Sequence, residues 1–461
     1  MQNNKNGAKI VAKIVFTGVL ENQSPIIIGK TKGGDVDLEI VRDEKGNFYI
    51  PASSFIGVLR HRFCEYANIS QNYQYQCFWG FQDDKVSIQS HLLIDDLKCG
   101  ISKISIRDGI AINQKKGIAK QQAKYDYEVF DRKAEFSLIG EVIVRDGFDQ
   151  SIFLKILATV KRDLEDGISV GAMTTKGFGR LKLNAFKAFL FEFPKDGELY
   201  LKFLFSNDFS LISNNSIVFK LPEPFPIESK DFKIDAEFQL KSSLIIGSYP
   251  SDPTAPDKVH LTRFENEPII SGTSLKGIIR SRAFKIVNTL SQIDCVELLK
   301  AAFGWVEVEK SGANQNIERK KKYRSRVVVE EIPLDGVIRS TQNRIKIDRF
   351  TGGGITGALF DSQPVWHKEE TICLKIIIKN YEEWEAGLML LILKDLWNGD
   401  LPIGGEKSIG RGVLKGKKAD IVFNSEKISI TQDGERLKIE GDRNRLESFV
   451  SAFSKKSKRE N

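Results

Sequence analysis

The chain has 461 residues, which is long for a single hydrophobic core and suits two domains of about 200 residues each. Its formal net charge of +8 and isoelectric point of about 8.9 favour a polyanion such as a nucleic acid as partner. It has no CxxC pair, apolar N-terminal segment or long apolar stretch, so we expect a cytoplasmic protein without disulfides, zinc knuckles or membrane spans.

The two halves of the chain begin alike. Residues 9–20 read KIVAKIVFTGVL and residues 231–240 read DFKIDAEFQL, and both runs predict a strand. A short apolar segment follows each run and ends at Gly29 or Gly247. A repeat of this length is a whole domain, so we expect any site in one half to have a counterpart in the other.

A helix start follows in both halves. Residues 50–60 read IPASSFIGVLR and residues 270–280 read ISGTSLKGIIR. Three residues recur at one constant offset: Ser54, Gly57 and Arg60 as Ser274, Gly277 and Arg280. We predict a helix with its N-cap at Ser53 or Ser54 in the first copy and at Thr273 in the second.

The second copy of this helix combines two cations with a helix N-terminus. Lys276 and Arg280 lie one turn apart and share a face, and the backbone N–H groups near the N-terminus also favour an anion. In the first copy Ile56 replaces the lysine, which leaves Arg60. We therefore expect a phosphate group to bind at these helix starts.

A long motif pair lies further along. Residues 110–129 and 345–365 align so that Tyr125 corresponds to Phe360, a larger offset than the one between the helix starts. Because the offset has grown, the second half contains insertions. The clearest is the basic stretch 311–326, which we expect to be a solvated loop, with phosphate contact by its residues from Arg319 to Arg326 as the alternative.

Each half closes with a glycine-rich segment. These segments lie at 170–183 and 403–416, and we match Arg180 to Arg411 because each follows a glycine. Turn residues at 206–231 predict the linker between the halves. Strands ahead of helices and a closing glycine loop predict two α+β domains with mostly antiparallel sheets.

The order of these elements resembles a known family. A glycine-rich turn, an IPxSSxxGxLR helix start, FWG or FG after the helix, a long hairpin and a closing KGFGR loop occur in order, twice. This order is similar to that of the backbone subunits of type III CRISPR effector complexes, which are members of the RAMP superfamily. The resemblance covers nearly the whole chain, which therefore looks like a tandem fusion of two such subunits, as in type III-D-like systems.

The resemblance implies a ferredoxin-like (RRM-type) core in each half, with a protruding hairpin called the thumb. The first domain would span residues 1–215 and the second residues 230–424, followed by a C-terminal hairpin and basic tail at 425–461. The thumbs would lie at about 105–135 and 335–366.

The resemblance also implies the partners, which are guide RNA, target RNA and other subunits of the type III effector, with no membrane. The core of such a subunit holds the guide RNA backbone. Each thumb pushes between bases, so that one target nucleotide at a time is displaced and then cut.

An aspartate ahead of the helix start does the cutting in similar proteins. Asp37, in the segment VDLEIVRD, matches that position ahead of Pro51. Asp257 precedes Ser271, the counterpart of Pro51, by the same spacing in the second half, with Asp252 as the fallback. The resemblance leaves two roles open: general base for the attacking 2′-hydroxyl, or ligand of a divalent ion, expected to be Mg²⁺.

Other candidate residues follow from the same resemblance. We expect eight residues to contact the RNA backbone: Ser54, Arg60, Lys176, Arg180, Ser274, Lys276, Arg280 and Arg411. Three thumb residues are candidates for stacking on bases, with packing inside the hairpin as the alternative: Tyr125, Tyr127 and Phe360. The four histidines do not recur at matching offsets, so we expect each to be structural.

Three functions compete. The leading hypothesis is a guide-RNA-binding backbone subunit with a metal-dependent endoribonuclease site in each half. The first alternative is a structural backbone that holds guide RNA while other subunits cut. The second is a guide-processing endoribonuclease of the same superfamily, which the absence of a recurring histidine argues against.

Overall fold

The protein is described from a computed structural model, which covers residues 9–458 except 31–36, 66, 70–71, 84–85, 101–103, 114–118, 132, 214–216, 227–229, 251, 253, 265, 291–293, 311–317 and 368–370. The chain folds into two compact units. The first comprises Met1–Arg107, Asp126–Ala172 and Gly179–Glu228. The second comprises Asp108–Tyr125, Met173–Phe178 and Ser229–Asn461.

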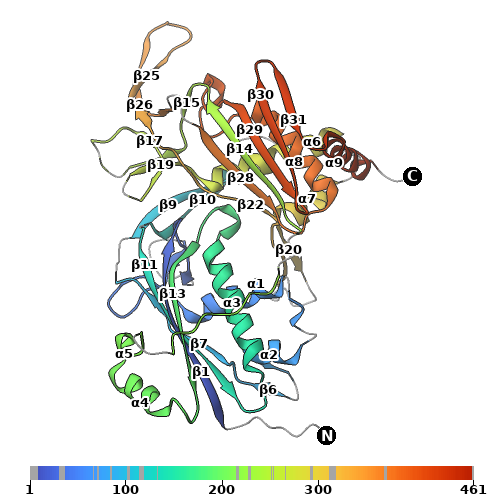
Figure 1. Cartoon of the computed structure of the whole chain (residues 1–461). Coiled ribbons are helices and arrows are strands. Elements are labelled where there is room, and N and C mark those ends of the chain that lie inside the picture. Colours follow the sequence, from blue (N-terminus) through green and yellow to red (C-terminus); the bar gives the residue numbers. More distant parts are fainter. Residues whose placement is uncertain are drawn as a thin grey trace. The chain divides into compact units, whose positions relative to one another are not determined.

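The first unit is built on a five-stranded antiparallel sheet with the order β12–β13–β1–β11–β7 (Figure 1). The helices and strands of the first repeat are β1 (Ile10–Asn22), β2 (Gly29–Lys30), β3 (Glu39–Ile40), β4 (Tyr49–Ile50), α1 (Ala52–Cys64), α2 (Tyr73–Trp79), β5 (Phe81–Gln82), β6 (Ser87–Ile88), β7 (Leu92–Ile94), β8 (Leu97–Lys98), β9 (Ile104–Ile112), β10 (Ala119–Phe130), β11 (Glu135–Arg145), α3 (Gln150–Asp166), β12 (Ile168–Ser169), η2 (Thr174–Lys176), β13 (Arg180–Glu192), α4 (Gly197–Ser206) and α5 (Phe209–Ser213).

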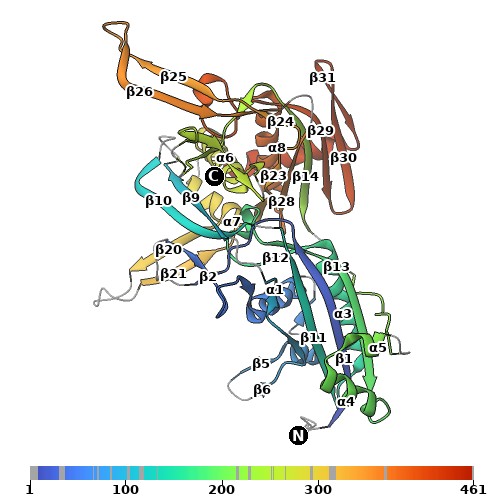
Figure 2. The ribbon, with the colours of Figure 1, turned by 90° about the vertical axis from the view of Figure 1, so that its left-hand side faces the viewer.

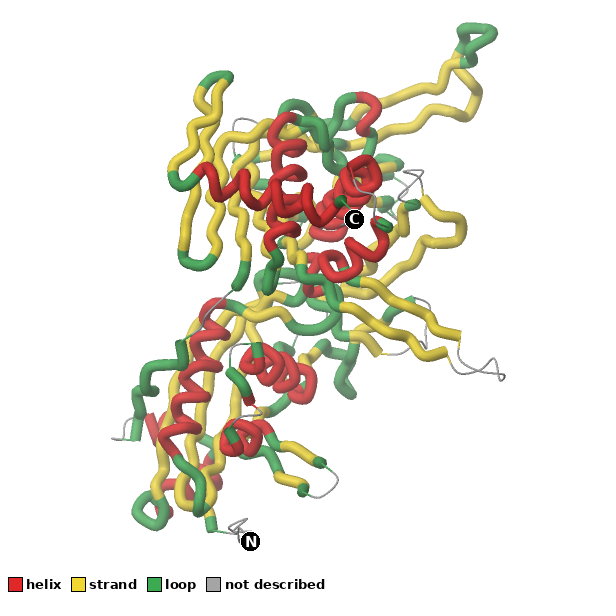
Figure 3. The backbone as a smooth tube through the Cα atoms, turned by 90° about the vertical axis from the view of Figure 1, so that its right-hand side faces the viewer, coloured by secondary structure: helices red, strands yellow, loops and turns green. Residues whose placement is uncertain are grey.

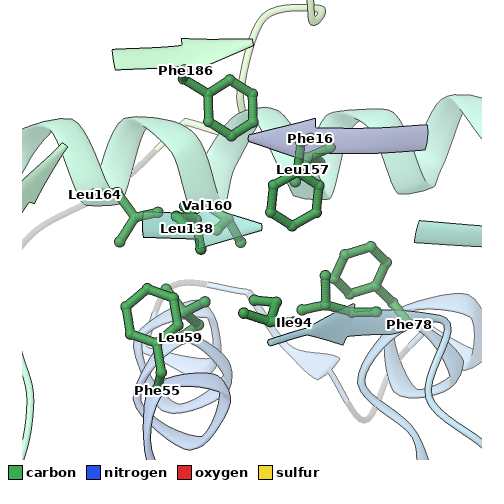
Figure 4. A pocket seen from close by; sticks show the side chains of 11 residues that line it. Phe16, Phe55, Leu59, Phe78, Ile94, Leu138, Leu157, Val160, Leu164 and Phe186 are labelled. Atoms are coloured by element: carbon green, nitrogen blue, oxygen red, sulfur yellow. The ribbon is translucent and has the colours of Figure 1, made fainter. Parts of the chain in front are cut away.

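The sheet of the first unit is covered on both faces. Successive residues of a strand point to opposite faces, and in β1 Phe16 packs toward α1 and α3 whereas Val15 packs toward α4 and α5. Figure 4 shows Phe16, Leu138 and Leu157 meeting from the sheet and from α3. A gap of about 10 Å³ remains among these side chains, and its lining is entirely apolar. It is a small packing defect of the core and has no polar group to orient a ligand.

The second unit repeats the plan with a six-stranded antiparallel sheet in the order β22–β28–β14–β29–β30–β31. The helices and strands of the second repeat are β14 (Phe232–Leu240), β15 (Ser243–Leu244), β16 (Gly247–Ser248), β17 (Lys258–His260), β18 (Thr262–Arg263), β19 (Glu267–Ile270), α6 (Gly272–Leu290), α7 (Cys295–Phe303), β20 (Trp305–Lys310), β21 (Glu318–Tyr323), β22 (Val327–Val329), β23 (Ile332–Pro333), β24 (Val337–Arg339), β25 (Gln342–Ile347), β26 (Gly354–Gln363), β27 (Val365–His367), β28 (Ile372–Ile378), α8 (Glu383–Asn398), η3 (Lys407–Ile409), β29 (Leu414–Phe423), β30 (Glu426–Asp433), β31 (Arg436–Glu440) and α9 (Arg443–Ser457).

The second core lies between this sheet and its helices. Strand β14 buries every second residue from Phe232 to Leu240, the period expected of a strand with one face on a core. Helix α8 packs on β29, and α9 packs on α8. Figure 3 shows the helices of the protein in red and the strands in yellow. Both units are therefore mixed α+β, as predicted. No helix in the described ranges is long and apolar enough to span a membrane.

Hairpins form at both predicted thumb segments. In the first repeat β9 pairs with β10, and in the second β25 pairs with β26 and projects from the rest of its unit (Figures 1 and 2). The predicted solvated loop 311–326 is only partly a loop. Its segment Glu318–Tyr323 forms strand β21, which pairs with β20, while residues 311–317 lie outside the described residues.

The two repeated helices begin earlier than predicted. Helix α1 starts at Ala52 after Pro51, so Ser53 and Ser54 lie inside its first turn, and the Ala52 N–H donates to Asp96 Oδ1 at 2.8 Å. Helix α6 starts at Gly272, and Ser271 Oγ accepts from the Ser274 N–H at 3.3 Å. The N-cap predictions at Ser53 or Ser54 and at Thr273 were therefore wrong, since both helices begin before those residues.

The chain ends in a hairpin and a helix. Strands β30 and β31 extend the sheet of the second unit beyond β29, and α9 runs from Arg443 to Ser457 with Phe449 and Phe453 buried. These elements belong to the core of the second unit.

Candidate nucleic-acid interface

Each predicted catalytic aspartate lies beside a second aspartate. In the first unit Asp37 is exposed in the loop before β3, and Asp126 is on β10. The backbone N–H of Asp37 donates to Asp126 Oδ1 at 3.0 Å, and the backbone N–H of Asp126 donates to Asp37 Oδ2 at 3.3 Å. Each aspartate is therefore both donor and acceptor to the other.

The second unit repeats this arrangement. The backbone N–H of Asp257 donates to Asp361 Oδ1 at 2.6 Å, and that of Asp361 donates to Asp257 Oδ2 at 3.1 Å. Asp257 follows Asp37 at the offset of the helix starts, and Asp361 follows Asp126 at the offset of the hairpin motif. Asp126 and Asp361 were not among the sequence candidates, although each directly follows a residue of the matched pair Tyr125 and Phe360.

The backbone around the two pairs also matches. Leu38 forms a parallel bridge to Tyr127, and β17 runs parallel to β26 from Lys258 onward. A Cβ atom on Gly29 would lie 2.6 Å from the Leu38 side chain, and one on Gly247 would lie 2.6 Å from the Lys258 side chain. In both units the side chain of the residue after the candidate aspartate thus lies against one of the two recurring glycines.

Further acidic residues tie each loop to its surroundings. In the first unit Glu128, two positions after Asp126, accepts from the Ile40 N–H at 3.0 Å and pairs with Arg42 at 2.8 Å. In the second unit Glu406 pairs with Lys258 at 3.3 Å. The segments that carry Asp37 and Asp257 are therefore held on both sides.

The fallback residue Asp252 has different surroundings. Its Oδ1 accepts from the backbone N–H and from the hydroxyl of Thr254, both at 2.8 Å, and closes a local turn. These hydrogen bonds lower the pKa of Asp252. Asp257, and not Asp252, reproduces the geometry of Asp37.

Each pair presents two carboxylates to a ligand. Mg²⁺ is usually bound by one or two carboxylates together with waters and substrate phosphates. Within the described ranges, no three or more His, Cys, Asp and Glu side chains gather in a way that would hold a metal ion.

The recurring residues of the two helices form one face of each helix. Ser54, Gly57 and Arg60 are spaced by three, and so are their counterparts, so each set lies along one side of α1 or α6. Gly57 and Gly277 are exposed, and a Cβ atom on either would meet nothing within 4 Å. Packing against the described residues therefore requires neither glycine.

Cations gather at the N-terminal half of α6. Lys276 is buried, and its ammonium donates to Ser325 Oγ and Val327 O at 2.8 Å and to Thr175 O at 3.3 Å. Burial and the nearby cations Lys176, Arg280 and Arg324 lower the pKa of Lys276 to about 7. Because its three N–H donors are already used, Lys276 supports the site without being free to contact a phosphate, contrary to expectation.

Two of its neighbours remain candidates for phosphate contact. Burial and Arg280 lower the pKa of Lys176, and burial lowers the pKa of Arg280. Arg280 lies over the Trp305 ring at 5.7 Å. The charges that act on Lys176 and Lys276 are all positive, so an anion placed here would relieve their mutual repulsion.

In the first repeat the matching helix is α1, which carries Arg60. Arg60 is exposed beside a surface hollow lined by Cys64 and Glu65, among others. Arg180 donates to Asp166 O at 2.8 Å and so satisfies the C-terminal end of α3. That hydrogen bond gives Arg180 a structural role, whereas Arg60 remains exposed to a ligand.

The two closing loops align differently from the expected match. Gly179 O accepts from the Val170 N–H, and Gly412 O accepts from the Ile403 N–H in the second unit, both at 2.9 Å. Gly179 therefore corresponds to Gly412, and Arg411 takes the place of the buried Phe178. Matching Arg180 to Arg411 was wrong.

This register explains where Arg411 lies. It is 3% exposed, its Nε pairs with Glu406 Oε2 at 3.0 Å, and its Nη1 donates to Ser243 Oγ at 3.2 Å. The expectation that Arg411 faces RNA is therefore not met, since its guanidinium is used inside the second unit.

The thumb aromatics differ in exposure. Tyr127 is 3% exposed and belongs to the core, and the Tyr125 ring lies over Gly109 of the facing strand. Both follow the alternative of packing. Phe360 is 44% exposed, and the more exposed thumb residue Phe350, at 100%, was not among the sequence candidates.

An ordered turn carries Phe350 at the tip of the β25–β26 hairpin. Asp348 Oδ1 accepts from the Phe350 N–H at 2.7 Å and from the Thr351 N–H at 3.0 Å, and the Gly352 N–H donates to Asp348 O at 2.9 Å. The exposed ring is thus carried on a turn that its own hydrogen bonds stabilise.

Two histidines are structural by their contacts. His260 accepts from the Ile246 N–H at 3.3 Å through Nδ1 and donates to Ile269 O at 2.8 Å through Nε2. Burial lowers the pKa of His260 to about 4. His91 is buried against Ile143 O, and burial lowers its pKa to about 4 as well. Neither imidazole is placed for proton transfer to a ligand.

Comparison with known proteins assigns the family. A family model described as the RAMP superfamily matches residues 19–182 and, a second time, residues 237–415. One aspartate pair lies in each matched stretch. No curated protein matches the chain. The two matches together cover more than half of the chain, which therefore belongs to the RAMP superfamily and carries its domain twice.

Proposed function

We propose that the chain is a guide-RNA-binding backbone subunit of a type III CRISPR effector, fused from two such subunits, and that each half cleaves complementary target RNA. Membership of the RAMP superfamily supports RNA binding. The observation that carries the cleavage is the duplicated aspartate pair, which has the same four hydrogen-bonding atoms in both units.

A ferredoxin-like core in each half is part of this proposal. In chain order these four strands are β1, β7, β11 and β13. The sheet order β13–β1–β11–β7 places the strand that is fourth in the chain beside the first, and the third beside the second. The order β29–β14–β28–β22 does the same in the second unit. A helix follows the first and third of the four strands in both, which supports the β-α-β-β-α-β plan.

Guide RNA binding is supported by the helix faces and their cations. Lys176 and Arg280 lie near Lys276, whose pKa their positive charges help to lower, so a phosphate bound there would offset the repulsion. The exposed glycines Gly57 and Gly277 leave room for a backbone to approach each helix closely. Salt should weaken this binding, because each phosphate contact releases counterions.

The thumbs carry exposed apolar side chains that suit unstacking of bases. In the second repeat Ile347, Phe350 and Leu359 are 59%, 100% and 69% exposed. In the first repeat Ile106 and Ile112 are 62% and 50% exposed. Such side chains gain contact area when they are inserted between bases.

The chemistry starts from a displaced target nucleotide. Its 2′-oxygen attacks the adjacent phosphorus, so that the O2′–P bond forms and the P–O5′ bond breaks. The leaving 5′-oxygen takes a proton from water, and the products are a 2′,3′-cyclic phosphate and a 5′-hydroxyl. Stacked A-form RNA does not align these atoms, and displacement of one nucleotide allows the in-line geometry. Asp37 or Asp257 receives the 2′-hydroxyl proton as general base, or holds a divalent cation.

A Mg²⁺ ion fits the donor set as an alternative to direct proton transfer. Asp37 in the first half and Asp257 in the second would hold it, together with waters and the RNA phosphate, and the ion would neutralise charge on the phosphate. In either role the carboxylates of Asp37 and Asp257 are required, so their removal tests the proposal without deciding between the roles.

The test uses the assembled effector complex with guide RNA. The double variant Asp37→Ala/Asp257→Ala should keep its guide RNA and leave a complementary target uncut, whereas the matched control Asp252→Ala should cut like the wild type. Unchanged cleavage by the double variant would support the structural backbone that only holds guide RNA. The guide-processing alternative gains no support from His91 or His260, which are buried on backbone groups.

A further inference from the structure

Asp126 and Asp361 are placed to orient the candidate catalytic aspartates. Each lies on the inner strand of a thumb hairpin, β10 or β26, and each is half-buried, whereas Asp37 and Asp257 are exposed. A strand with neighbours on its ladder is a firmer support than the loop that carries Asp37 or Asp257.

The reciprocal hydrogen bonds fix two features of the loop aspartate. The bond from its backbone N–H to the strand carboxylate, 3.0 Å for Asp37 and 2.6 Å for Asp257, anchors the main chain. The backbone N–H of the strand aspartate donates to Oδ2 of the loop aspartate, at 3.3 Å for Asp37 and 3.1 Å for Asp257, and this bond sets the side-chain rotamer of the loop aspartate. Within the described part of the chain these bonds end on Oδ2 and not on Oδ1 of the loop aspartate.

The same geometry arises from unlike loops. The segment before Asp37 is rich in glycine, whereas the segment before Asp257 holds three prolines within residues 250–256. The first loop continues into the two-residue strand β3, and the second into the three-residue strand β17. A turn that merely connected two elements would not need the same pair of hydrogen bonds in both units, since loops of different sequence usually adopt different contacts.

We propose that Asp126 and Asp361 are positioning residues for target cleavage, each holding the aspartate of its own half in the orientation that reacts. This inference rests on the proposed cleavage function. Its essential element is the acceptor oxygen of the strand residue, and not its negative charge. An asparagine at the same position keeps that oxygen, and an alanine removes it.

The experiment compares Asp126→Asn with Asp126→Ala, and Asp361→Asn with Asp361→Ala, in the assembled effector. Single-turnover cleavage of a guide-complementary target is measured separately for each cut, and the cut made by the unaltered half is the internal control. Target affinity and thermal unfolding are measured alongside, so that a folding defect is recognised. The variants Asp37→Ala and Asp257→Ala are measured in parallel.

The expected result is selective. Each alanine variant slows one cut by about 10- to 100-fold, the size of effect expected when a reacting group is misplaced by about 1 Å. Each asparagine variant cuts within about threefold of the wild type, because rescue by the conservative change restores the anchor. Guide binding, target affinity and the half-maximal Mg²⁺ concentration stay unchanged in the asparagine variants.

Other outcomes overturn the inference in distinguishable ways. If Asp37→Ala abolishes a cut while Asp126→Ala does not slow it, the positioning role is refuted and the proposed function stands. If Asp126→Asn is as slow as Asp126→Ala, the charge is required and the residue acts as a ligand or base instead. If Asp37→Ala cuts normally, the proposed function fails, and the positioning role fails with it.

Discussion

Replacing the exposed helix glycines by alanine should stabilise the free protein while weakening its hold on RNA. Gly57 and Gly277 lie inside α1 and α6, neither adopts a positive φ, and a Cβ atom on either would meet nothing within 4 Å. Alanine is favoured over glycine inside a helix by about 1 kcal/mol. For a unit of this size, that corresponds to a rise of about 2–4 °C in the unfolding temperature.

The binding effect has the opposite sign. If an RNA backbone approaches the helix over these glycines, an added methyl group forces it away, at a cost of about 1–3 kcal/mol for overpacking a tight contact. That cost lowers guide affinity by about 5- to 150-fold. Thermal unfolding of the free chain and fluorescence anisotropy with labelled guide RNA measure the two effects on the same samples.

A third glycine provides the control. Gly387 lies inside α8, and a Cβ atom there would lie 2.1 Å from Phe449 O on α9. Gly387→Ala should therefore destabilise the second unit without a specific effect on RNA. The reasoning is refuted if Gly57→Ala and Gly277→Ala raise the unfolding temperature but leave guide affinity unchanged, or if they lower the unfolding temperature as Gly387→Ala does.

Three further predictions follow from single sites. Phe350→Ala should slow target cleavage by about 5- to 150-fold, the value of one base–aromatic stack, with no change in thermal unfolding. The control Phe205→Ala, at an exposed site outside the thumbs, should cut normally. Equal cleavage rates for both variants would contradict a stacking role of Phe350. Arg411→Met should lower the free energy of unfolding by about 3 kcal/mol in urea titrations, because it leaves Glu406 with one cation fewer; a neutral result would contradict the structural role. The pKa of His260 is lowered to about 4 by burial, so the unfolded chain binds more protons between pH 6.5 and 4. Stability should therefore fall as pH falls through that window, and His260→Gln should flatten the slope; an unchanged slope would show that other groups cause it.

The duplicated plan was readable from the sequence because it depends on local patterns. Strand-like apolar runs predicted β1 and β14, and β14 buries every second residue as such a run should. The two sequence offsets also hold between the members of the aspartate pairs. The period of the apolar residues and the spacing between motifs are properties of the sequence, so they can be recognised without knowledge of tertiary contacts.

The wrong predictions concern positions whose structure is determined by tertiary contacts. The helix starts were misplaced because Asp96 and Ser271, which lie outside the predicted first turns, satisfy the end groups. Arg411 was expected at the surface because its neighbours in sequence are glycines, whereas Glu406 and Ser243 draw it inside. Such partners lie far away along the chain or in loops, so local sequence patterns do not predict them.

For the same reason, only half of the candidate site could be predicted from the sequence. Asp37 and Asp257 followed from their distance to the helix starts, but Asp126 and Asp361 are far from their partners along the chain and meet them only through the fold. The match between Tyr125 and Phe360 identified the correct segment, but the prediction there concerned the aromatic residues themselves. The acidic residue that follows each of them makes the contact.

The most direct test of two cutting sites in one chain is to map target fragments from the single variants Asp37→Ala and Asp257→Ala in otherwise identical effector complexes. Cleavage ends are identified by sequencing, together with their 5′-hydroxyl and cyclic phosphate termini. Two sites predict that each variant loses a different set of cuts and keeps the other. The same fragment pattern from both variants and the wild type would contradict cleavage by this chain.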